Sequence, residues 1–565
     1  MMTTATDRVL LAYKRIAEVD RPEVWITLRD EADVLAEAAG LDESLPLYGT
    51  VLAVKDNIDV AGLSTTAACP EFARTPDADA TVVARLRAAG ALVLGKTNLD
   101  QFATGLVGTR SPYGAVRHAH DPEKISGGSS SGSATAVALG IVDIALGTDT
   151  AGSGRVPAAF ASLVGIKPTL GLVPNTGVVP ACVDYDAVTV FAADITTATA
   201  AMAIMIGADS ADPRSRAWPA TVPLSAPPRP RVAVPRTEDL RALCPEYAEA
   251  FERTVSGLDA VGIDHEIVDI SVLLDAAVLL YDGAIVAQRY AAVGEFLSTS
   301  PEHADPTVSR IVLGAKDPAA HAYVDDLSTL LAAKAHAASI LDGLDGLVLP
   351  TTTEHPTIAA VQADPLGINR RLGTFTNFCN LLDMAAVAVP GARTTAGDPF
   401  GVMVVGPAFT DQVLLDIGAA VADQDTAVLV EDGVDVLVVG AHLRGFPLNG
   451  QLVERGARFV GEVSTSADYR LVDLGTTPPK PGLVRGGSAS IAGELYRMAP
   501  AHLGTFLAGL PAPMGLGSVT LSDGREVVGF MCAADAAEAG TDITEFGGWR
   551  AYTANSGVRT PDSGV

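Results

Sequence analysis

Short apolar runs alternate with amphipathic stretches along most of the chain. Apolar runs at 52–54, 91–95 and 346–350 predict buried strands, and the stretches 80–89 and 319–341 have the spacing of helices. Strands that alternate with helices are typical of an α/β domain. The pattern therefore predicts a mixed, largely parallel central sheet covered by helices.

Further elements follow from the same periodicity. The pattern predicts two helices within 7–40, helices over 197–206, 273–290 and 414–421, and a strand over 231–234. The helix over 414–421 is expected to end this domain.

The pattern changes near Glu431. From Val434 onward, short Val-rich strands such as 436–439, 457–460 and 469–472 are separated by Gly/Pro turns. Spacing of this kind predicts a small β-rich domain. We therefore expect two domains, 1–431 and 432–565.

Two Gly/Ser-rich segments, 126–133 and 147–157, stand out in the first domain. The block between them, 134–146, is apolar apart from Thr135, Gly140 and Asp143 and predicts a buried helix that leads into a strand. So many small residues indicate a close approach to the main chain. This edge of the sheet is where we expect the chemistry, although a phosphate cradle or a flexible turn would use similar residues. The ending of a P-loop is missing, which argues against nucleotide binding.

Charge and cysteine content limit the possible binding partners and the cellular compartment. The formal net charge is −28, so nucleic acid and anionic membranes would be repelled. Five scattered cysteines favour a reducing, cytoplasmic compartment. The first residues contain no apolar signal segment, and no apolar run has membrane length, so we expect a soluble, unexported protein.

Ser153, in the second Gly/Ser segment, is a candidate nucleophile, but a serine hydroxyl needs a base. The segments contain no histidine, and the nearby His118 and His120 lie in a predicted surface loop. Lys55 follows an apolar strand, where burial would lower its pKa and let the amine be neutral, and so act as a base, near neutral pH. A lone lysine at such a position is more often a solvated charge. Ser129 supplies a hydroxyl to relay the proton.

The second segment also offers main-chain donors. The N–H groups of its small residues are predicted to form an oxyanion hole for a tetrahedral intermediate; these residues are Thr150, Ala151, Gly152 and Ser153.

These motifs resemble the amidase signature family. Its three ordered motifs are matched by 127–134, 147–158 and 165–169, and an upstream Lys-Asp-Asn is matched by 55–57. The resemblance spans roughly residues 45–410. It implies a Ser-cisSer-Lys triad of Ser153, Ser129 and Lys55, with Ser129 entered by a cis peptide bond.

The resemblance implies a reaction without a cofactor. Asp100, Asp149 and Asp383 are not accompanied by a ligand-spaced cluster, so we predict no metal site. Arg155 is expected to brace the nucleophile loop.

Within the family, the chain is most similar to the allophanate hydrolase subgroup. The similarity lies in 65–70, 96–105 and 374–383 and in an appended domain that resembles the γ-glutamylcyclotransferase-like fold. It implies a small-molecule substrate, allophanate, whose carboxylate is held by Tyr281 and Arg289. These two residues are eight apart, so on one regular helix they would lie about 80° apart around the axis.

The resemblance also implies the course and setting of the reaction. Allophanate would lose ammonia, and the N-carboxycarbamate product would then lose carbon dioxide, in the degradation of urea or of triazines. We expect a homodimer. His442, in the appended domain, is interpreted as a satisfied core residue or as a group for the second step. The alternatives are a broad-range amidase or amidotransferase A-type subunit, and a catalytically silent binding protein.

Overall fold

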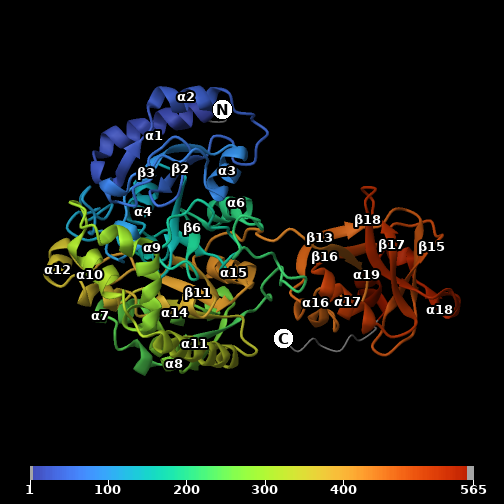
Figure 1. Ribbon diagram of the computed structural model, residues 1–565. Helices are drawn as coiled ribbons and strands as arrows, with labels where there is room; N and C mark the ends of the chain where they lie inside the picture. The colour runs from blue at the N-terminus through green and yellow to red at the C-terminus, as the bar shows by residue number, and fades with distance from the viewer. Residues whose placement is uncertain (1–3, 557–565) are drawn as a thin grey trace. The chain divides into compact units, whose positions relative to one another are not determined.

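The computed structural model describes residues 4–556, which form two compact units (Figure 1). The first unit comprises residues up to 217 and 229–429, and the second comprises 218–228 and 430 onward. The single division that the sequence predicts near Glu431 leaves out the short segment 218–228. This segment belongs to the second unit because Leu224 is buried there, and its N–H donates to the carbonyl of Gly456 at 2.9 Å.

The first unit is built on one mixed sheet of eleven strands. In spatial order the strands are β1 (Trp25–Leu28), β3 (Leu92–Thr97), β2 (Val51–Lys55), β4 (Ile144–Asp149), β6 (Ala187–Ala192), β5 (Val164–Lys167), β10 (Met384–Pro390), β11 (Gly401–Pro407), β9 (Gly346–Pro350), β7 (Arg231–Pro235) and β8 (Asp264–Val268).

The α/β fold class is confirmed, but the sheet is not largely parallel. Only β2–β3, β2–β4, β7–β8 and β7–β9 pair in parallel, and the other six pairings are antiparallel. Continuous apolar strands suggested a parallel sheet, because strands buried on both faces read that way. Here the helices cover antiparallel strands as well, so their sequences look the same.

The helices that cover this sheet are α1 (Ala5–Val19), α2 (Glu31–Ala39), α3 (Thr81–Ala88), α4 (Ser131–Ala138), α5 (Val156–Phe160), α6 (Ile195–Met205), α7 (Pro245–Ser256), α8 (Ser271–Asp282), α9 (Ala287–Leu297), α10 (Pro306–Gly314), α11 (Ala320–Ile340), α12 (Ile358–Ala363), α13 (Gly367–Leu372), α14 (Asn377–Leu381) and α15 (Asp411–Val421). Within the unit, α1 and α2 pack on each other near β2 and β3, and α8 and α11 lie at the opposite end (Figure 1). Between residues 4 and 556 no single helix is long and apolar enough to cross a membrane; the bent pair α8 and 284–297 reaches that threshold on length and composition alone.

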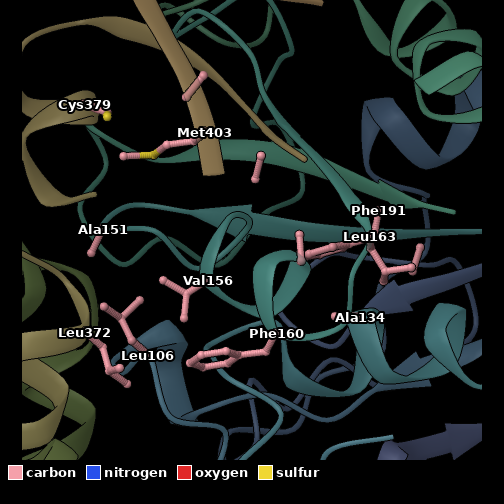
Figure 2. Packing of buried hydrophobic residues seen from close by; sticks show 14 of the residues in the cluster. Leu106, Ala134, Ala151, Val156, Phe160, Leu163, Phe191, Leu372, Cys379 and Met403 are labelled. Atoms are coloured by element: carbon pink, nitrogen blue, oxygen red, sulfur yellow. The ribbon is translucent and has the colours of Figure 1, made fainter. Parts of the chain in front are cut away.

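A large apolar core surrounds the second Gly/Ser segment. Figure 2 shows part of it, with Ala151 and Val156 on either side of position 153 in the chain and Phe160 at the end of α5. Leu106 and Leu372, from distant parts of the sequence, lie close together in the same view. The segment is therefore held in a rigid environment.

The second unit is rich in β-structure, as predicted. Its five-stranded sheet has the order β13 (Arg458–Ser464), β16 (Ala492–Met498), β12 (Val434–Val438), β18 (Glu526–Cys532) and β17 (Met514–Thr520), and a smaller sheet has the order β15 (Pro481–Arg485), β14 (Tyr469–Asp473) and β19 (Thr541–Asp542). Its helices are α16 (Gly450–Val453), α17 (Pro500–Ala508), α18 (Ala534–Ala539) and α19 (Trp549–Ser556).

Candidate active site

Lys55 is the last residue of β2, which lies between the parallel strands β3 and β4. The carboxyl ends of parallel strands meet at one edge of a sheet, so Lys55 lies beside Thr148 near the end of β4. Its side chain is fully buried, and Nζ lies 2.8 Å from Ser129 Oγ, 2.9 Å from Ser130 Oγ and 2.8 Å from Thr148 Oγ1.

Burial lowers the pKa of Lys55 to about 7, against the opposing effect of the carboxylates of Asp100, Asp149 and Asp186. A substantial fraction of the amine is therefore neutral near pH 7. Neutral amines accept protons, so this side chain has the state that a general base needs.

Ser129 lies in the first Gly/Ser segment, directly before α4. The peptide bond between Gly128 and Ser129 is cis, as the family resemblance implies. The strand β4 passes very close to this loop: a Cβ at Gly147 would lie 2.7 Å from Ser130 Oγ, so only glycine fits there. This close approach brings the hydroxyls of Ser129 and Ser130 within reach of Lys55.

Ser153 lies between β4 and α5, and only 2% of it is exposed. Its hydroxyl donates to the carbonyl oxygen of Gly105 at 3.4 Å. Among the described residues it makes no hydrogen bond to Ser129. The structure thus contains the contact from Lys55 to Ser129, while the contact from Ser129 to Ser153 is not formed.

The backbone donors around Ser153 differ from the predicted set in one member. The N–H of Gly152 donates to Asp149 Oδ1 at 2.9 Å, so it is already engaged. In the part of the chain that the structure describes, the N–H groups of Thr150, Ala151 and Ser153 have no hydrogen-bond partner. Three of the four predicted donors are therefore available.

Asp149 and Arg155 form a buried ion pair that holds this loop. Arg155 donates from two nitrogens to the two carboxylate oxygens of Asp149, each at 2.9 Å, and both side chains are fully buried. Although burial alone would raise it, the guanidinium holds the pKa of Asp149 below its usual value. The carboxylate also accepts from the N–H groups of Gly152 at 2.9 Å and Gly154 at 3.0 Å. Arg155 thus braces the loop through Asp149.

Asn380, which the sequence did not single out, completes this brace. Its side-chain oxygen accepts from Arg155 at 3.0 Å, and its amide donates to the carbonyls of Asp149 and Tyr185, each at 2.8 Å. The residue lies within the matched stretch 374–383, so that motif was the available signal.

Tyr281 and Arg289 do not lie on one helix, contrary to the expectation of a regular helix over 273–290. Helix α8 ends at Asp282, the backbone of Gly283 is extended, and α9 begins at Ala287. The side chains nevertheless meet: Arg289 donates to the Tyr281 hydroxyl at 3.2 Å and lies 4.9 Å from the centre of its ring.

Arg289 is 1% exposed and, within residues 4–556, makes hydrogen bonds to two hydroxyls and forms no ion pair with a carboxylate. Its second nitrogen donates to Thr104 Oγ1 at 3.0 Å, and Nε has no partner there. Although burial opposes the charge, Tyr281, Cys182 and Asp186 raise the pKa of Arg289 above its usual value, so it is a cation. A buried cation without an anion is costly unless a ligand supplies one.

Other candidate groups have structural partners. His118 is buried, contrary to the surface loop predicted for it, and its Nε2 lies 3.0 Å from the carbonyl oxygen of Phe160. Asp100 accepts from the N–H groups of 107, 108 and 110, each at 3.0 Å. Asp383 pairs with Arg216 and Lys334.

Asp100, Asp149 and Asp383, the carboxylates considered as metal ligands, thus accept hydrogen bonds or form ion pairs with other residues of the protein. One exposed group, Glu71, Glu302 and His303, brings possible ligand atoms within 4.8 Å of one another in the described region. It lies on the surface and contributes nothing to the site described here.

His442, in the second unit, lines a cavity of about 220 Å³ together with Gln451, Lys480 and Phe530. Its Nε2 lies 3.1 Å from Gln451 Oε1, and its ring stacks on Phe530. Burial lowers the pKa of His442 to about 4, so the ring is neutral at pH 7. It has the contacts of a satisfied core residue and also borders a cavity.

Each of the two units matches a different protein-family model. The amidase family model matches residues 7–415, which is most of the chain. The chain belongs to the amidase family. The model of the allophanate hydrolase C-terminal domain matches residues 434–554.

Several members of the amidase family are similar over most or nearly all of the chain. A crystal structure of allophanate hydrolase from Kluyveromyces lactis is 37% identical, with a TM-score of 0.87, over 98% of this chain and 97% of that one. Urea amidolyase from Saccharomyces cerevisiae is 41% identical over 96% of this chain but 32% of its own length. The chain therefore spans about a third of the urea amidolyases that it matches. The A-type subunit of glutamyl-tRNA(Gln) amidotransferase from Thermus thermophilus is 33% identical over 72% of this chain and 91% of its own length.

Proposed function

We propose that the chain is a metal-free allophanate hydrolase. The observation that carries this proposal is the buried cation Arg289, which has no carboxylate partner among the described residues and donates to Tyr281 and Thr104. Allophanate has a carboxylate beside its terminal amide, so it supplies the missing anion and the scissile carbonyl in one small molecule. The family match and the likeness to an allophanate hydrolase over both units support the same substrate.

In this proposal Lys55, Ser129 and Ser153 form the catalytic triad. The neutral amine of Lys55 accepts a proton from Ser129, and Ser129 accepts one from Ser153 as that hydroxyl attacks. The 2.8 Å contact between Lys55 and Ser129 supports the first transfer. The second transfer requires the Ser153 hydroxyl to rotate from Gly105 toward Ser129, and hydroxyl rotation about Cα–Cβ is an ordinary rotamer change.

Attack on the terminal carbonyl places negative charge on its oxygen. The N–H groups of Thr150, Ala151 and Ser153 are proposed to stabilise this charge, since they are free of other partners in the described chain. Gly152 belongs to the loop, but its N–H already serves Asp149.

The guanidinium of Arg289 and the hydroxyl of Tyr281 are proposed to bind the substrate carboxylate. A guanidinium fork matches a carboxylate in a bidentate geometry. Pairing would also relieve the cost of the buried cation, so binding energy is directed to substrates that carry the anion.

The reaction then divides into two transfers. The tetrahedral intermediate expels ammonia, which takes the proton held by the relay, and leaves an acyl ester on Ser153. Water, activated by the same Ser129 and Lys55, hydrolyses this ester and releases N-carboxycarbamate, which loses carbon dioxide. The proposed setting is the degradation of urea or triazines.

A second candidate function is a broad-range amidase or an amidotransferase A-type subunit. The likeness to the A-type subunit of glutamyl-tRNA(Gln) amidotransferase favours it for the first unit. This candidate leaves the second unit and the unpaired Arg289 without a role. It predicts a stable complex with a partner chain and a preference for neutral amides.

Ammonia release from allophanate, biuret and simple carboxamides tests the proposal. We expect the purified protein to prefer allophanate, and Arg289→Gln to lose that preference through a higher KM. The exposed Arg310→Gln is the matched control and is expected to behave as the wild type. A preference for simple carboxamides would contradict the substrate and favour the second candidate.

We also propose a homodimer in the cytoplasm. All five cysteines are free thiols, which supports a reducing compartment. Light scattering on the purified protein tests the dimer, and a monomer would contradict it.

A further inference from the structure

Thr104 contacts the cation that we assign to the substrate carboxylate. Its hydroxyl oxygen lies 3.0 Å from a terminal nitrogen of Arg289 and 3.1 Å from the carbonyl oxygen of Phe102. A hydroxyl has one proton, and the carbonyl can only accept it, so the Thr104 oxygen presents lone pairs to the guanidinium. The contact is directional, and Thr104 itself is 1% exposed.

The backbone that carries Thr104 is fixed independently of Arg289. Arg110 donates to the carbonyl of Thr104 at 2.9 Å. Asp100 gathers the N–H groups of Val107, Gly108 and Arg110, each at 3.0 Å. Thr104 therefore lies at a fixed position, and its hydroxyl holds one terminal nitrogen of the Arg289 guanidinium in place.

The next residue, Gly105, contacts the proposed nucleophile. Its carbonyl oxygen accepts the Ser153 hydroxyl at 3.4 Å. Consecutive Cα atoms are about 3.8 Å apart, so two adjacent residues of one anchored loop touch the attacking group and the cation. The nucleophile and the cation are thus both contacted by neighbouring residues of the same loop.

A nucleophile and a cation contacted from adjacent loop residues favour a short substrate. In allophanate one nitrogen lies between the scissile carbonyl and the carboxylate, so both ends of the substrate lie close together, which suits a nucleophile and a cation that adjacent residues contact. A longer acid amide would place its carboxylate beyond Arg289, and a neutral amide would leave the cation unpaired.

We propose that Thr104 is a specificity-determining positioning residue: its hydroxyl holds Arg289 at the distance from Ser153 that fits an amide whose carboxylate is one atom away from the scissile carbonyl. This inference deepens the proposed function and rests on it. Thr104 acts through Arg289 and has no part in proton transfer.

The test compares Thr104→Val, which keeps the shape and removes the hydroxyl, with Thr104→Ser, which keeps the hydroxyl. We expect Thr104→Val to raise KM for allophanate about tenfold, the order expected for losing a hydrogen bond to a charged group, with kcat within about threefold. The kcat/KM for biuret, which has no carboxylate, should not change. Thr104→Ser should restore most of the wild-type KM.

Two results would overturn the inference while leaving the proposed function intact. One is an unchanged KM in Thr104→Val, and the other is an equal loss of kcat on allophanate and biuret, which would indicate general support of the loop. Thermal unfolding checks the fold of each variant, and Thr104→Ala takes the place of the valine variant if that one does not fold.

Failure of the proposed function gives a different result. A wild-type protein that does not prefer allophanate to biuret would overturn the substrate assignment, and the inference about Thr104 would fall with it.

Discussion

The side-chain nitrogen of Lys55 lies 2.8 Å from the hydroxyl of Ser129, and both groups are fully buried. The arrangement joins a lysine whose amine burial leaves partly neutral near pH 7 to a serine that has no other side-chain hydrogen bond among the described residues. The hydroxyl from which Lys55 takes a proton in the proposed mechanism is thus already in contact with its amine.

The first prediction concerns the pH dependence of hydrolysis. A protonated Lys55 cannot accept a proton, and its pKa is about 7, so kcat/KM for allophanate should rise with pH through about 7 and level off above it. Lys55→Arg, which stays protonated, should be inactive across the same range. Initial rates of ammonia release at a series of pH values measure this, and a flat profile would contradict a lysine base.

The second prediction concerns stability and follows from the same burial. The pKa of Lys55 is about 7 in the folded chain and 10.5 as the ordinary value. Between these values the unfolded chain binds the extra proton, so the contribution of Lys55 to the free energy of unfolding rises with pH. Urea unfolding of the wild type and Lys55→Met should therefore diverge across this window, with the wild type gaining relative stability as pH increases. Parallel curves would show that Lys55 titrates normally.

The third prediction concerns the nucleophile. Ser153→Ala should lower ammonia release by at least about a thousandfold, because the acyl ester cannot form. Its thermal unfolding should match the wild type, since the lost hydroxyl made a single weak contact at 3.4 Å. Ser133→Ala, at another buried hydroxyl that donates to the carbonyl of Leu146, is a suitable control and should retain turnover. Equal activity in Ser153→Ala would favour a catalytically silent role for these segments.

The fourth prediction concerns the buried ion pair. Arg155→Met leaves the Asp149 carboxylate buried without its partner, which should cost about 3–5 kcal/mol in the free energy of unfolding. Arg155→Lys keeps a charge but cannot bridge both oxygens, so its loss should be smaller. Urea midpoints at one pH measure both. An equal effect of the two variants would mean that the fork geometry is unimportant.

The fifth prediction uses two glycines with positive φ. Gly152 (φ 127°) has no room for a side chain because a Cβ would overlap the Thr376 hydroxyl, whereas Gly140 (φ 65°) has open space. Gly140→Ala should cost only backbone strain, about 1 kcal/mol, with full activity. Gly152→Ala should lower the free energy of unfolding more than Gly140→Ala does. It should also lose turnover, because the added methyl group displaces Ser153. Similar activities for the two variants would contradict a strict requirement for this loop geometry.

Local patterns predicted the parts of the site that depend on single strands. An apolar run that ends in Lys55 becomes the buried strand β2, and the block after the first Gly/Ser segment becomes α4 and β4. In each case burial of the element decides its structure, and burial is visible in the sequence.

Contacts between distant segments could not be read in this way. The order of the eleven strands depends on pairings such as β5 with β10, and the strand β1 between the first two helices was missed because its four residues carry no clear alternation. Asn380 and Thr104 reach partners more than 180 positions away, at Arg155 and Arg289. Single-sequence periodicity contains no information on such partners.

The break between α8 and α9 illustrates the limit of helical spacing. The stretch over 273–290 is apolar enough for one helix, yet Gly283 lets the backbone extend and the helices separate. Tyr281 and Arg289 meet because of this bend, which an uninterrupted helix would not allow.

Because the segment 218–228 belongs to the second unit, the chain passes between the two units three times, after residues 217, 228 and 429. A protease that cuts near 430 would therefore produce two fragments that remain associated, with Leu224 still inserted among residues of the C-terminal fragment. A protein truncated near residue 430 would lack the residues that bury Leu224, so the segment 218–228 would be exposed to solvent. A shortened protein that contains only the second unit must therefore also include the eleven residues 218–228.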